Sequence, residues 1–249
     1  MFQQRIGYCP QFDTNLELMS GEEMLYLFAR LRGIPKSHIK KTVTSFIETV
    51  DLQEHAQKIS SSYSGGNKRK LSIGISMIGL PPLIFLDEPT SGIDPVARRQ
   101  IWDLLTAIKA SGISVVLTSH SMEECEALCD CVTIMVNGQL QCMGSVTHLR
   151  AKYGTGFMIE AKLKFTHDEA DNENLQKFKD KIKAAIPSSI VKSEHQGTLS
   201  YHVTDVNETW SHMFTVMEEI KESGLLENYA VSSPSLEQVF LSFAKMQKN

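Results

Sequence analysis

The chain has 249 residues, of which 42% are hydrophobic and 22% are charged, and its formal net charge is −4. This length suits one large domain or two modest ones. Nucleic-acid-binding proteins are usually basic, so the mildly acidic net charge gives no support to nucleic-acid binding by the chain as a whole. No apolar run approaches the roughly 20 residues that span a bilayer, and the amino terminus shows no signal-peptide pattern. Membrane association is therefore expected through a partner. Five cysteines, an odd number, favour a reducing compartment over a disulfide framework.

The first third of the chain is predicted to be mostly helical. Residues 5–12 have the pattern of a short strand that ends in a loop at Pro10. Ser20 and Glu23 form a capping box at the start of the first helix. Apolar spacing and glycine or proline stops then place three helices, at about residues 20–33, 37–50 and 67–78.

Residues 83–88, Leu-Ile-Phe-Leu-Asp-Glu, are the stretch around which the other elements are arranged. The four apolar residues predict a strand that is buried on both faces, as in a parallel sheet. The strand delivers Asp87 and Glu88 to its carboxyl end, where ligands bind in open α/β sheets. Two adjacent acids are costly there unless a cation or a proton-transfer task needs them. A hydrolytic phosphate site would use both, one for Mg²⁺ and one for water; a strand that ends in solvated acids is the alternative.

Further strands and helices follow this central strand. Asp94 as N-cap and Pro95 at the first helical position start a helix that runs to about residue 110. Residues 113–118 form the next strand, and His120 follows it closely. The remaining elements of this half are a short capped helix and a hairpin with an Asn-Gly turn, at about residues 122–129 and 132–141. Strands that alternate with helices predict a parallel sheet with crossover connections.

The pattern changes beyond Gly154. Alternating and helix-spaced apolar residues predict the order strand, helix, strand, strand, helix, strand over residues 157–231. This order matches the ferredoxin-like split βαβ unit, and a last helix is expected over 234–247. We therefore expect two domains, residues 1–154 and 155–249.

Three candidate ligand groups lie near the predicted sheet edge or at a helix start. Gln11, in the loop after the first strand, offers a neutral oxygen to Mg²⁺ or water, although taken alone a solvated loop glutamine is the expected explanation. The segment 64–67, Ser-Gly-Gly-Asn, opens a helix, where first-turn N–H groups and the helix dipole form an anion site; a glycine-rich turn is the alternative. His120 lies on the same sheet edge as Glu88 and can donate to a phosphate or hold a water, or it is structural.

Taken together, these residues resemble the nucleotide-binding domain of an ATP-binding-cassette (ABC) transporter. Five of the family's motifs have matches in order and spacing: the Q-loop (Gln11), the signature (63–67), Walker B (83–88), the D-loop (91–94) and the switch histidine (His120). Residues 7–11, 63–71, 118–128 and 236–240 are similar to the A subfamily of lipid exporters, in which the last of these closes a cytosolic regulatory domain. The resemblance implies an α/β fold, namely a partial P-loop NTPase domain with a parallel sheet and a helical subdomain, followed by a small ferredoxin-like α+β domain.

The resemblance also implies a role for each matching residue. Glu88 would be the general base for the attacking water, a role worth roughly 10²–10⁴-fold in rate, and His120 would contact the γ-phosphate. Asp87 would hold Mg²⁺ through water, and Gln11 would complete the shell of the metal or of the water. The other matching positions would grip ATP bound to the opposite nucleotide-binding domain or link the two sites, and they are Ser64, Gly65, Gly66, Asn67, Ser91 and Asp94.

The sequence departs from the family pattern in one important respect. No GxxxxGK[ST] segment occurs, so the phosphate-cradling Walker A loop is missing. We interpret the chain as a carboxyl-terminal fragment or a truncated gene model of a larger transporter. Tyr63 and Asn67 replace the commoner leucine and glutamine of the signature, as is usual in the A subfamily.

Two other patterns receive structural interpretations. Cys125, Cys129 and Cys131 contain no CxxC pair, so free buried thiols are expected rather than a metal site with His120. The basic run 68–70, Lys-Arg-Lys, could help to hold phosphates, but a solvated helix face is the expected explanation.

Three functions compete. The first is an ATPase module that uses ATP and Mg²⁺ to drive lipid transport from the cytosolic face of a membrane. Its expected partners are a second nucleotide-binding domain and transmembrane domains, and no nucleic acid is expected among them. The second is a non-hydrolysing module that docks on other cassettes, which the absent Walker A favours for the isolated chain. The third is a soluble cassette ATPase that acts on DNA or ribosomes; DNA-handling relatives place long coiled coils between Q-loop and signature, where this chain has compact helices.

Overall fold

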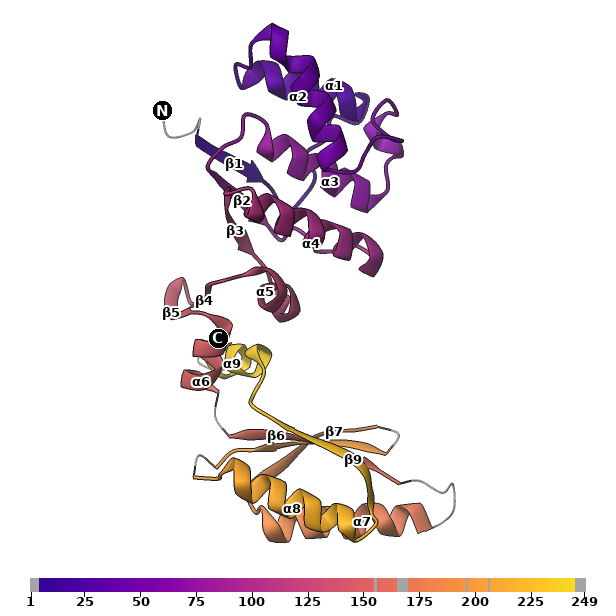
Figure 1. The fold of residues 1–249 in the computed structure, drawn as a ribbon, viewed down its shortest axis with the longest axis vertical. Coiled ribbons are helices and arrows are strands. Elements are labelled where there is room, and N and C mark those ends of the chain that lie inside the picture. Colours follow the sequence, from indigo (N-terminus) through magenta and orange to yellow (C-terminus); the bar gives the residue numbers. More distant parts are fainter. Residues whose placement is uncertain (1–4, 155, 165–169, 196, 206, 245–249) are drawn as a thin grey trace. The chain divides into compact units, whose positions relative to one another are not determined.

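The computed structural model describes residues 5–154, 156–164, 170–195, 197–205 and 207–244 (Figure 1). The chain divides into two compact units, Met1–Cys129 and Asp130–Asn249. The expected domain boundary after residue 154 stays a prediction, because compactness alone also assigns residues 130–154 to the second unit.

The first unit is built on a three-stranded parallel sheet. The strands are β1 (Ile6–Cys9), β2 (Leu83–Asp87) and β3 (Ser114–Thr118), in the order β1-β2-β3. The helices are α1 (Gly21–Leu31), α2 (Lys36–Thr49), α3 (Gly65–Met77), α4 (Pro95–Ala110) and α5 (Met122–Leu128). The predicted parallel sheet with crossover helices is therefore confirmed.

Side-chain caps set the starts of these helices. The capping box of α1 is present, with Ser20 Oγ accepting from the Glu23 N–H at 3.2 Å and Glu23 Oε2 accepting from the Ser20 N–H at 2.8 Å. Asp94 caps α4 by accepting from two backbone N–H groups. Helix α3 begins at Gly65, two residues earlier than predicted, because Ser64 is its N-cap and accepts from the Asn67 N–H.

The two faces of the parallel sheet differ in burial. On one face Cys9, Ile84 and Leu86 are buried in the core of the unit. On the other face Tyr8 and Val116 flank Phe85 in register, and they are 58% and 48% exposed. The prediction that β2 is buried on both faces is wrong, because the described helices leave this second face largely uncovered.

The second unit begins with a hairpin and a helix. Strands β4 (Val132–Val136) and β5 (Gln139–Gly144) pair antiparallel, and α6 (Val146–Tyr153) follows them. Asn137 and Gly138 have φ values of 51° and 75°. Two positive φ values in a two-residue loop match the twist of the strands, so the predicted Asn-Gly hairpin is confirmed.

A four-stranded antiparallel sheet forms the rest of the second unit. Its strands are β6 (Phe157–Leu163), β7 (Ser189–His195), β8 (Thr198–Val203) and β9 (Leu226–Ser232), in the order β7-β8-β6-β9. Helices α7 (Ala170–Ala185) and α8 (Trp210–Glu222) cover one face of this sheet (Figure 1). The βαββαβ order and the strand pairing confirm the predicted ferredoxin-like unit.

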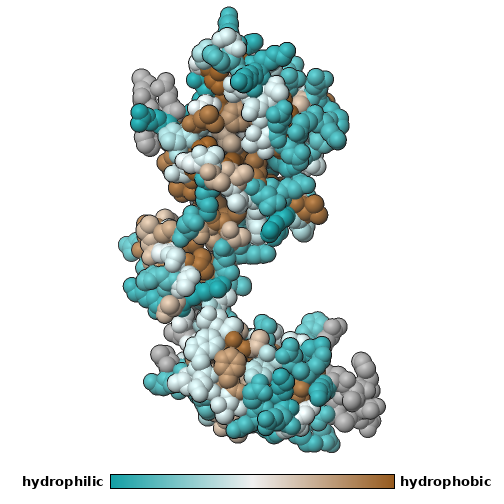
Figure 2. Space-filling view, in the orientation of Figure 1, coloured by the Kyte–Doolittle hydropathy of each residue, from teal (hydrophilic) through white to brown (hydrophobic). Residues whose placement is uncertain are grey.

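The last helix, α9 (Leu236–Ala244), packs against α6 and β4. The predicted end of this helix at residue 247 lies outside the described residues. No described helix is long and apolar enough to cross a bilayer. In the space-filling view, the apolar patches on the first unit lie within a mainly hydrophilic surface (Figure 2).

Candidate functional site

The candidate site lies at the carboxyl ends of β2 and β3. Asp87 is the last residue of β2, and Glu88 follows it with a φ of 47°. This left-handed conformation is uncommon for a residue with a side chain and costs of order 1–3 kcal/mol. The Glu88 N–H donates to the backbone oxygen and to Oγ1 of Thr118, at 3.2 and 3.1 Å. The end of β3 therefore holds Glu88 in its strained conformation.

Glu88 and His120 form a direct pair at this edge. Glu88 Oε2 lies 2.7 Å from His120 Nδ1, with the Glu88 side chain 18% and the His120 side chain 73% exposed. The structure thus places both side chains at one sheet edge, as the sequence predicts. Since Nδ1 faces the carboxylate, Nε2 remains available to another group.

Two oxygen donors suited to Mg²⁺ lie at the carboxyl ends of the strands, Asp87 directly before Glu88 and Gln11 after the neighbouring strand β1. Asp87 Oδ1 accepts from Thr118 Oγ1 at 2.5 Å. Gln11 is exposed two residues beyond β1, the strand next to β2. Mg²⁺ is usually bound by one or two carboxylates together with substrate phosphates and waters. Because the described residues contain no larger cluster of potential metal ligands, Asp87 and Gln11 fit a magnesium ion only if phosphate oxygens complete its shell.

A polar pocket of about 260 Å³ opens next to the Glu88–His120 pair. It is lined by Glu88, Thr90, Ser91, Gly92, Arg98, Ser119, His120 and Ser121. Ser91 of the predicted D-loop therefore faces the same hollow as Glu88. Asp94 is absent from this lining and caps α4 instead.

The Ser64–Asn67 segment presents a separate polar surface at the start of α3. Ser64 and Gly65 are exposed, and the O–H of Ser64 remains free to donate while its oxygen caps the helix. Gly66 is buried against α4, where an added Cβ would lie 2.6 Å from the Cβ of Ala97. Ser64 and Gly65 thus present the start of α3 to solvent, as an anion site requires. The Asn67 N–H is already used in the cap, and the segment does not line the Glu88 pocket.

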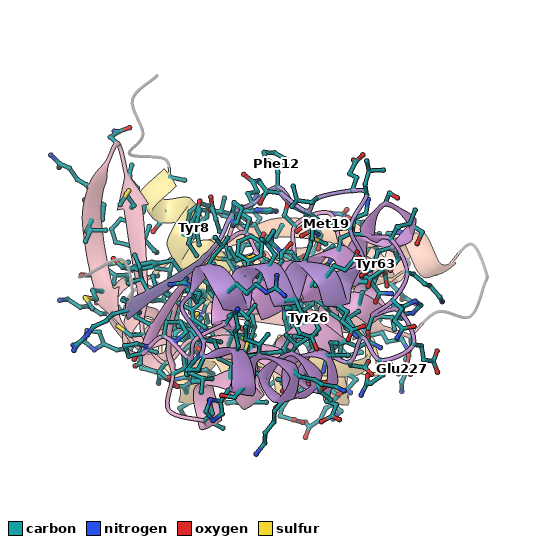
Figure 3. All side chains as sticks on the ribbon, turned by 90° about the horizontal axis from the view of Figure 1, so that it is seen from above. Tyr8, Phe12, Met19, Tyr26, Tyr63 and Glu227 are labelled. Atoms are coloured by element: carbon teal, nitrogen blue, oxygen red, sulfur yellow. The ribbon has the colours of Figure 1, made fainter. Side chains whose placement is uncertain are left out.

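A further exposed apolar side chain lies in the loop that carries Gln11. Phe12 is 78% exposed and points away from the ribbon (Figure 3). A single exposed apolar side chain is common on protein surfaces and does not by itself mark a binding site.

Two basic residues that we expected on a solvated helix face are buried instead. Arg69 and Lys70 are 2% and 4% exposed, so that prediction is wrong. Lys70 Nζ pairs with Asp51 Oδ2 at 3.0 Å. Helical spacing gave a usable signal, because the run places Lys70 on the same face of α3 as the buried residues Gly66 and Ile73.

Sequence reasoning also missed a buried polar link next to the pocket. Glu124 is 1% exposed, and its Oε1 accepts from Thr90 Oγ1 at 2.8 Å and from Trp102 Nε1 at 3.2 Å. The sequence predicted only a short capped helix over this stretch. The contacts join the loop after β2 to α4 and α5.

The five cysteines are free thiols. Of the three that were expected to be buried, Cys125 is buried and Cys129 is half-buried, but Cys131 is exposed, so the expectation is wrong for Cys131. Burial raises the pKa of Cys9 to about 11. A hydrogen bond with Cys129, together with burial, raises the pKa of Cys125. Neither thiol is activated as a nucleophile by this environment.

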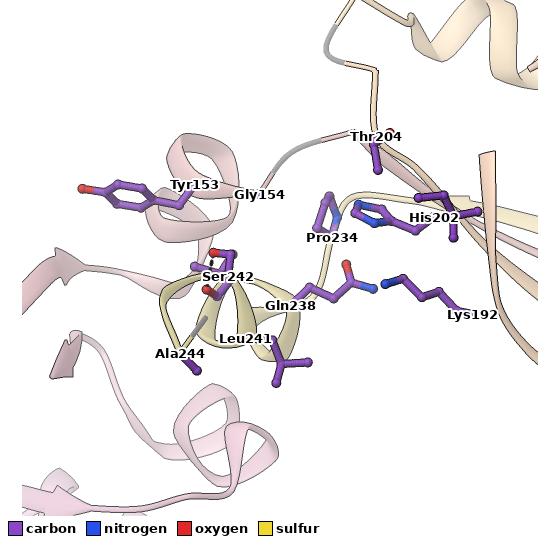
Figure 4. Close-up of a pocket in the computed structure, with 12 residues that line it drawn as sticks. Tyr153, Gly154, Lys192, His202, Thr204, Pro234, Gln238, Leu241, Ser242 and Ala244 are labelled. Carbon is purple, nitrogen blue, oxygen red and sulfur yellow. Dashed lines mark hydrogen bonds between the residues drawn. The ribbon is translucent and has the colours of Figure 1, made fainter. Parts of the chain in front are cut away.

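A larger pocket of about 670 Å³ lies in the second unit (Figure 4). Lys192 and His202 face it from the sheet, and Gln238 faces it from α9. It contains none of the site residues predicted from the sequence.

Comparisons with known proteins identify both parts of the chain. Residues 1–91 match the family described as ABC transporter, and residues 154–233 match the family described as ABCA1-like, C-terminal R1 regulatory domain. Among individual proteins, the human phospholipid-transporting ATPase ABCA3 is 49% identical over 245 residues. ATP-binding cassette sub-family A member 17 of the mouse and the human retinal-specific phospholipid-transporting ATPase ABCA4 are each 44% identical.

These relatives are much longer than the chain. The alignments cover 98%, 99% and 98% of this chain but only 14%, 14% and 11% of ABCA3, member 17 and ABCA4. A solved ATP-binding subunit of an ABC transporter is also similar, with 25% identity, a TM-score of 0.54, and coverage of 61% of this chain and 63% of that one. CbiO1 from Clostridium perfringens shares the fold, with a TM-score of 0.56 over 60% of this chain and 61% of that one. The chain therefore belongs to the ABC transporter family, as nucleotide-binding-domain residues followed by a regulatory domain of the A-subfamily type.

Proposed function

We propose that this chain forms part of a Mg-ATP-hydrolysing cassette that drives lipid transport from the cytosolic face of a membrane. The observation that carries the proposal is the Glu88–His120 contact at the sheet edge, 2.7 Å between Oε2 and Nδ1. The names of the ABCA3 and ABCA4 relatives, phospholipid-transporting ATPases, support the lipid class.

The Glu88 carboxylate is suited to accept a proton from an attacking water. Its position is fixed at three points: by the strand β2, by the N–H contacts to Thr118, and by His120. The same imidazole presents Nε2 away from Glu88. When the ring is protonated both nitrogens donate, so that Nδ1 can serve Glu88 while Nε2 donates to a phosphate oxygen. Asp87 and Gln11 would hold the Mg²⁺, which neutralises developing charge on the phosphates when bound.

The exposed start of α3 is suited to a nucleotide held mainly by another cassette. Ser64 offers its hydroxyl, Gly65 a first-turn N–H and Asn67 its side-chain amide, and Gly66 allows α3 to approach α4. Ser91 and Asp94 would lie at the interface between the two cassettes. The partners proposed are therefore a second nucleotide-binding domain and the transmembrane domains that move the lipid.

The test replaces the proposed base in the native gene product, whose mass and amino-terminal sequence are determined first. Glu88→Gln keeps the shape of the side chain but removes its basicity. We expect phosphate release to fall roughly 10²–10⁴-fold, while Mg-ATP binding is retained. Equal hydrolysis by both proteins would contradict the proposal.

A second candidate is a module that binds other cassettes without hydrolysing ATP. The observation in its favour is the absence of a GxxxxGK[ST] segment from the sequence. Absence of Mg-ATP binding by the native product, with pairing to another cassette intact, would support this second function.

A further inference from the structure

Arg69, which follows the Ser64–Asn67 segment on α3, extends its guanidinium group to the carboxyl end of β2. Nε donates to the backbone oxygen of Pro89 at 2.9 Å. Nη2 donates to the backbone oxygens of Asp87 and Glu88, at 2.6 and 3.1 Å. The side chain thus binds three successive carbonyl groups around the strained turn at Glu88.

The other end of the same guanidinium binds the loop that carries Gln11. Nη1 donates to the backbone oxygens of Pro10 and Gln11, the latter at 3.2 Å, and lies 3.5 Å from Asp13 Oδ1. Asp13 in turn accepts from Ser72 Oγ on α3 at 2.7 Å. One buried side chain therefore connects two loops that are more than 70 residues apart in the sequence.

These contacts match the donor geometry of arginine. The guanidinium carries five N–H groups in a rigid plane, and five backbone carbonyl oxygens surround it. A lysine ammonium offers three donors from a single point and cannot span the same acceptors. Most of the partners are neutral carbonyl oxygens, so the charge of Arg69 is balanced only in part by Asp13.

We propose that Arg69 is a positioning residue that couples the Gln11 loop to the Glu88 turn and links both to the Ser64–Asn67 segment. This inference rests on the proposed function. Helix α3 carries at its start the groups that would contact the nucleotide of the partner cassette. Less than two turns later it carries Arg69, which binds the Gln11 loop and the Glu88 turn of this chain. Both sets of groups therefore belong to one helix, Gly65–Met77.

The test compares Arg69→Lys with Lys70→Met. Lys70 is a matched control, because it is equally buried on the same helix but pairs with Asp51, away from the site. In the full chain, Arg69→Lys is expected to speed amide hydrogen exchange in both the 11–15 and 88–91 segments, because the two loops lose a shared anchor. Lys70→Met is expected to leave exchange in both segments unchanged.

Hydrolysis by the native product gives the second readout. A catalytic group misplaced by about 1 Å costs roughly 10²-fold in rate, so Arg69→Lys is expected to lower kcat by about that factor while KM changes less than about threefold. Lys70→Met should retain kcat.

Exchange that speeds in only one loop, or in neither, would overturn the coupling. Unchanged kcat in Arg69→Lys would do the same where the native product hydrolyses ATP. If the native product does not hydrolyse ATP at all, the proposed function fails, and the exchange comparison still decides whether Arg69 couples the loops.

Discussion

Gly66 approaches α4 so closely that an added methyl group has no room. The nearest atom to a Cβ at Gly66 is the Ala97 Cβ, at 2.6 Å, whereas a Cβ at Gly65 would lie 3.8 Å from the Ile93 side chain. Two adjacent glycines of one motif therefore differ in what they require. Packing within this chain requires glycine at position 66. At position 65 packing leaves room for a side chain, so contact with a ligand is the remaining reason for a glycine there.

We expect Gly66→Ala to destabilise the chain by about 1–3 kcal/mol, because overpacking forces α3 and α4 apart. Gly65→Ala is the matched control and should leave stability unchanged or raise it slightly, since alanine is the better helix former. Urea unfolding midpoints of the two variants measure the difference. Equal midpoints would show that the α3–α4 contact accommodates the methyl group.

Cys9 predicts a pH dependence of stability. Burial raises the pKa of this thiol from its ordinary value of 9.0 to about 11 in the folded state. The folded chain therefore binds this proton more tightly than the unfolded chain does. The stability that this contributes is fully present below pH 9 and is lost as the pH rises through about 11.

The measurement is the free energy of unfolding of wild type and Cys9→Ala between pH 8 and 11. Wild type is expected to lose stability more steeply than Cys9→Ala in that window. The difference of the two slopes isolates Cys9 from tyrosines that titrate in the same range, such as Tyr201, whose pKa burial raises to about 12. Parallel curves would show that Cys9 does not titrate differently in the folded and unfolded states.

At the scale of elements, helix boundaries follow from local signals that the sequence displays directly. The Ser20–Glu23 capping box and the Asp94-Pro95 start need only residues within one turn. The Asn137-Gly138 turn is equally local, because both residues tolerate positive φ. These features are predictable from sequence because each depends only on neighbouring residues. The contact between Glu88 and His120 is predictable for a different reason, because parallel strands place their carboxyl ends at the same edge of the sheet.

The features that escaped prediction depend on contacts distant in sequence. Arg69 resembles any basic residue of a solvated helix until β1 and β2 place carbonyl oxygens around it. Likewise, four apolar residues in β2 indicate burial but do not tell how many faces the neighbouring helices cover. The Glu124 link to Thr90 and Trp102 requires three segments to converge.

At the scale of the molecule, the second unit has a core of its own. The buried residues that join its four-stranded sheet to α7 and α8 all lie between Phe157 and Leu226. Helix α9, by contrast, packs against α6 and β4, which precede residue 154. The proposed boundary after residue 154 therefore divides α9 from α6 and β4, but it leaves intact the sheet core and the contact of Gln238 with Met158 on β6.

We expect a fragment of residues 155–249 to unfold cooperatively by itself, with α9 unprotected against amide exchange. A fragment of residues 130–249 is the control, in which α9 should be protected. Thermal unfolding followed by circular dichroism, together with exchange on both fragments, checks this. Loss of cooperative unfolding in the shorter fragment alone would place the boundary near residue 129 instead.

The bare sheet face of Tyr8, Phe85 and Val116 has a consequence for work in solution. Exposed apolar patches mark surfaces that contact other proteins or promote aggregation. Sedimentation of the purified chain will therefore register clustering that has nothing to do with nucleotide. Only association that responds to a substitution at Ser64 reports on genuine pairing of two cassettes.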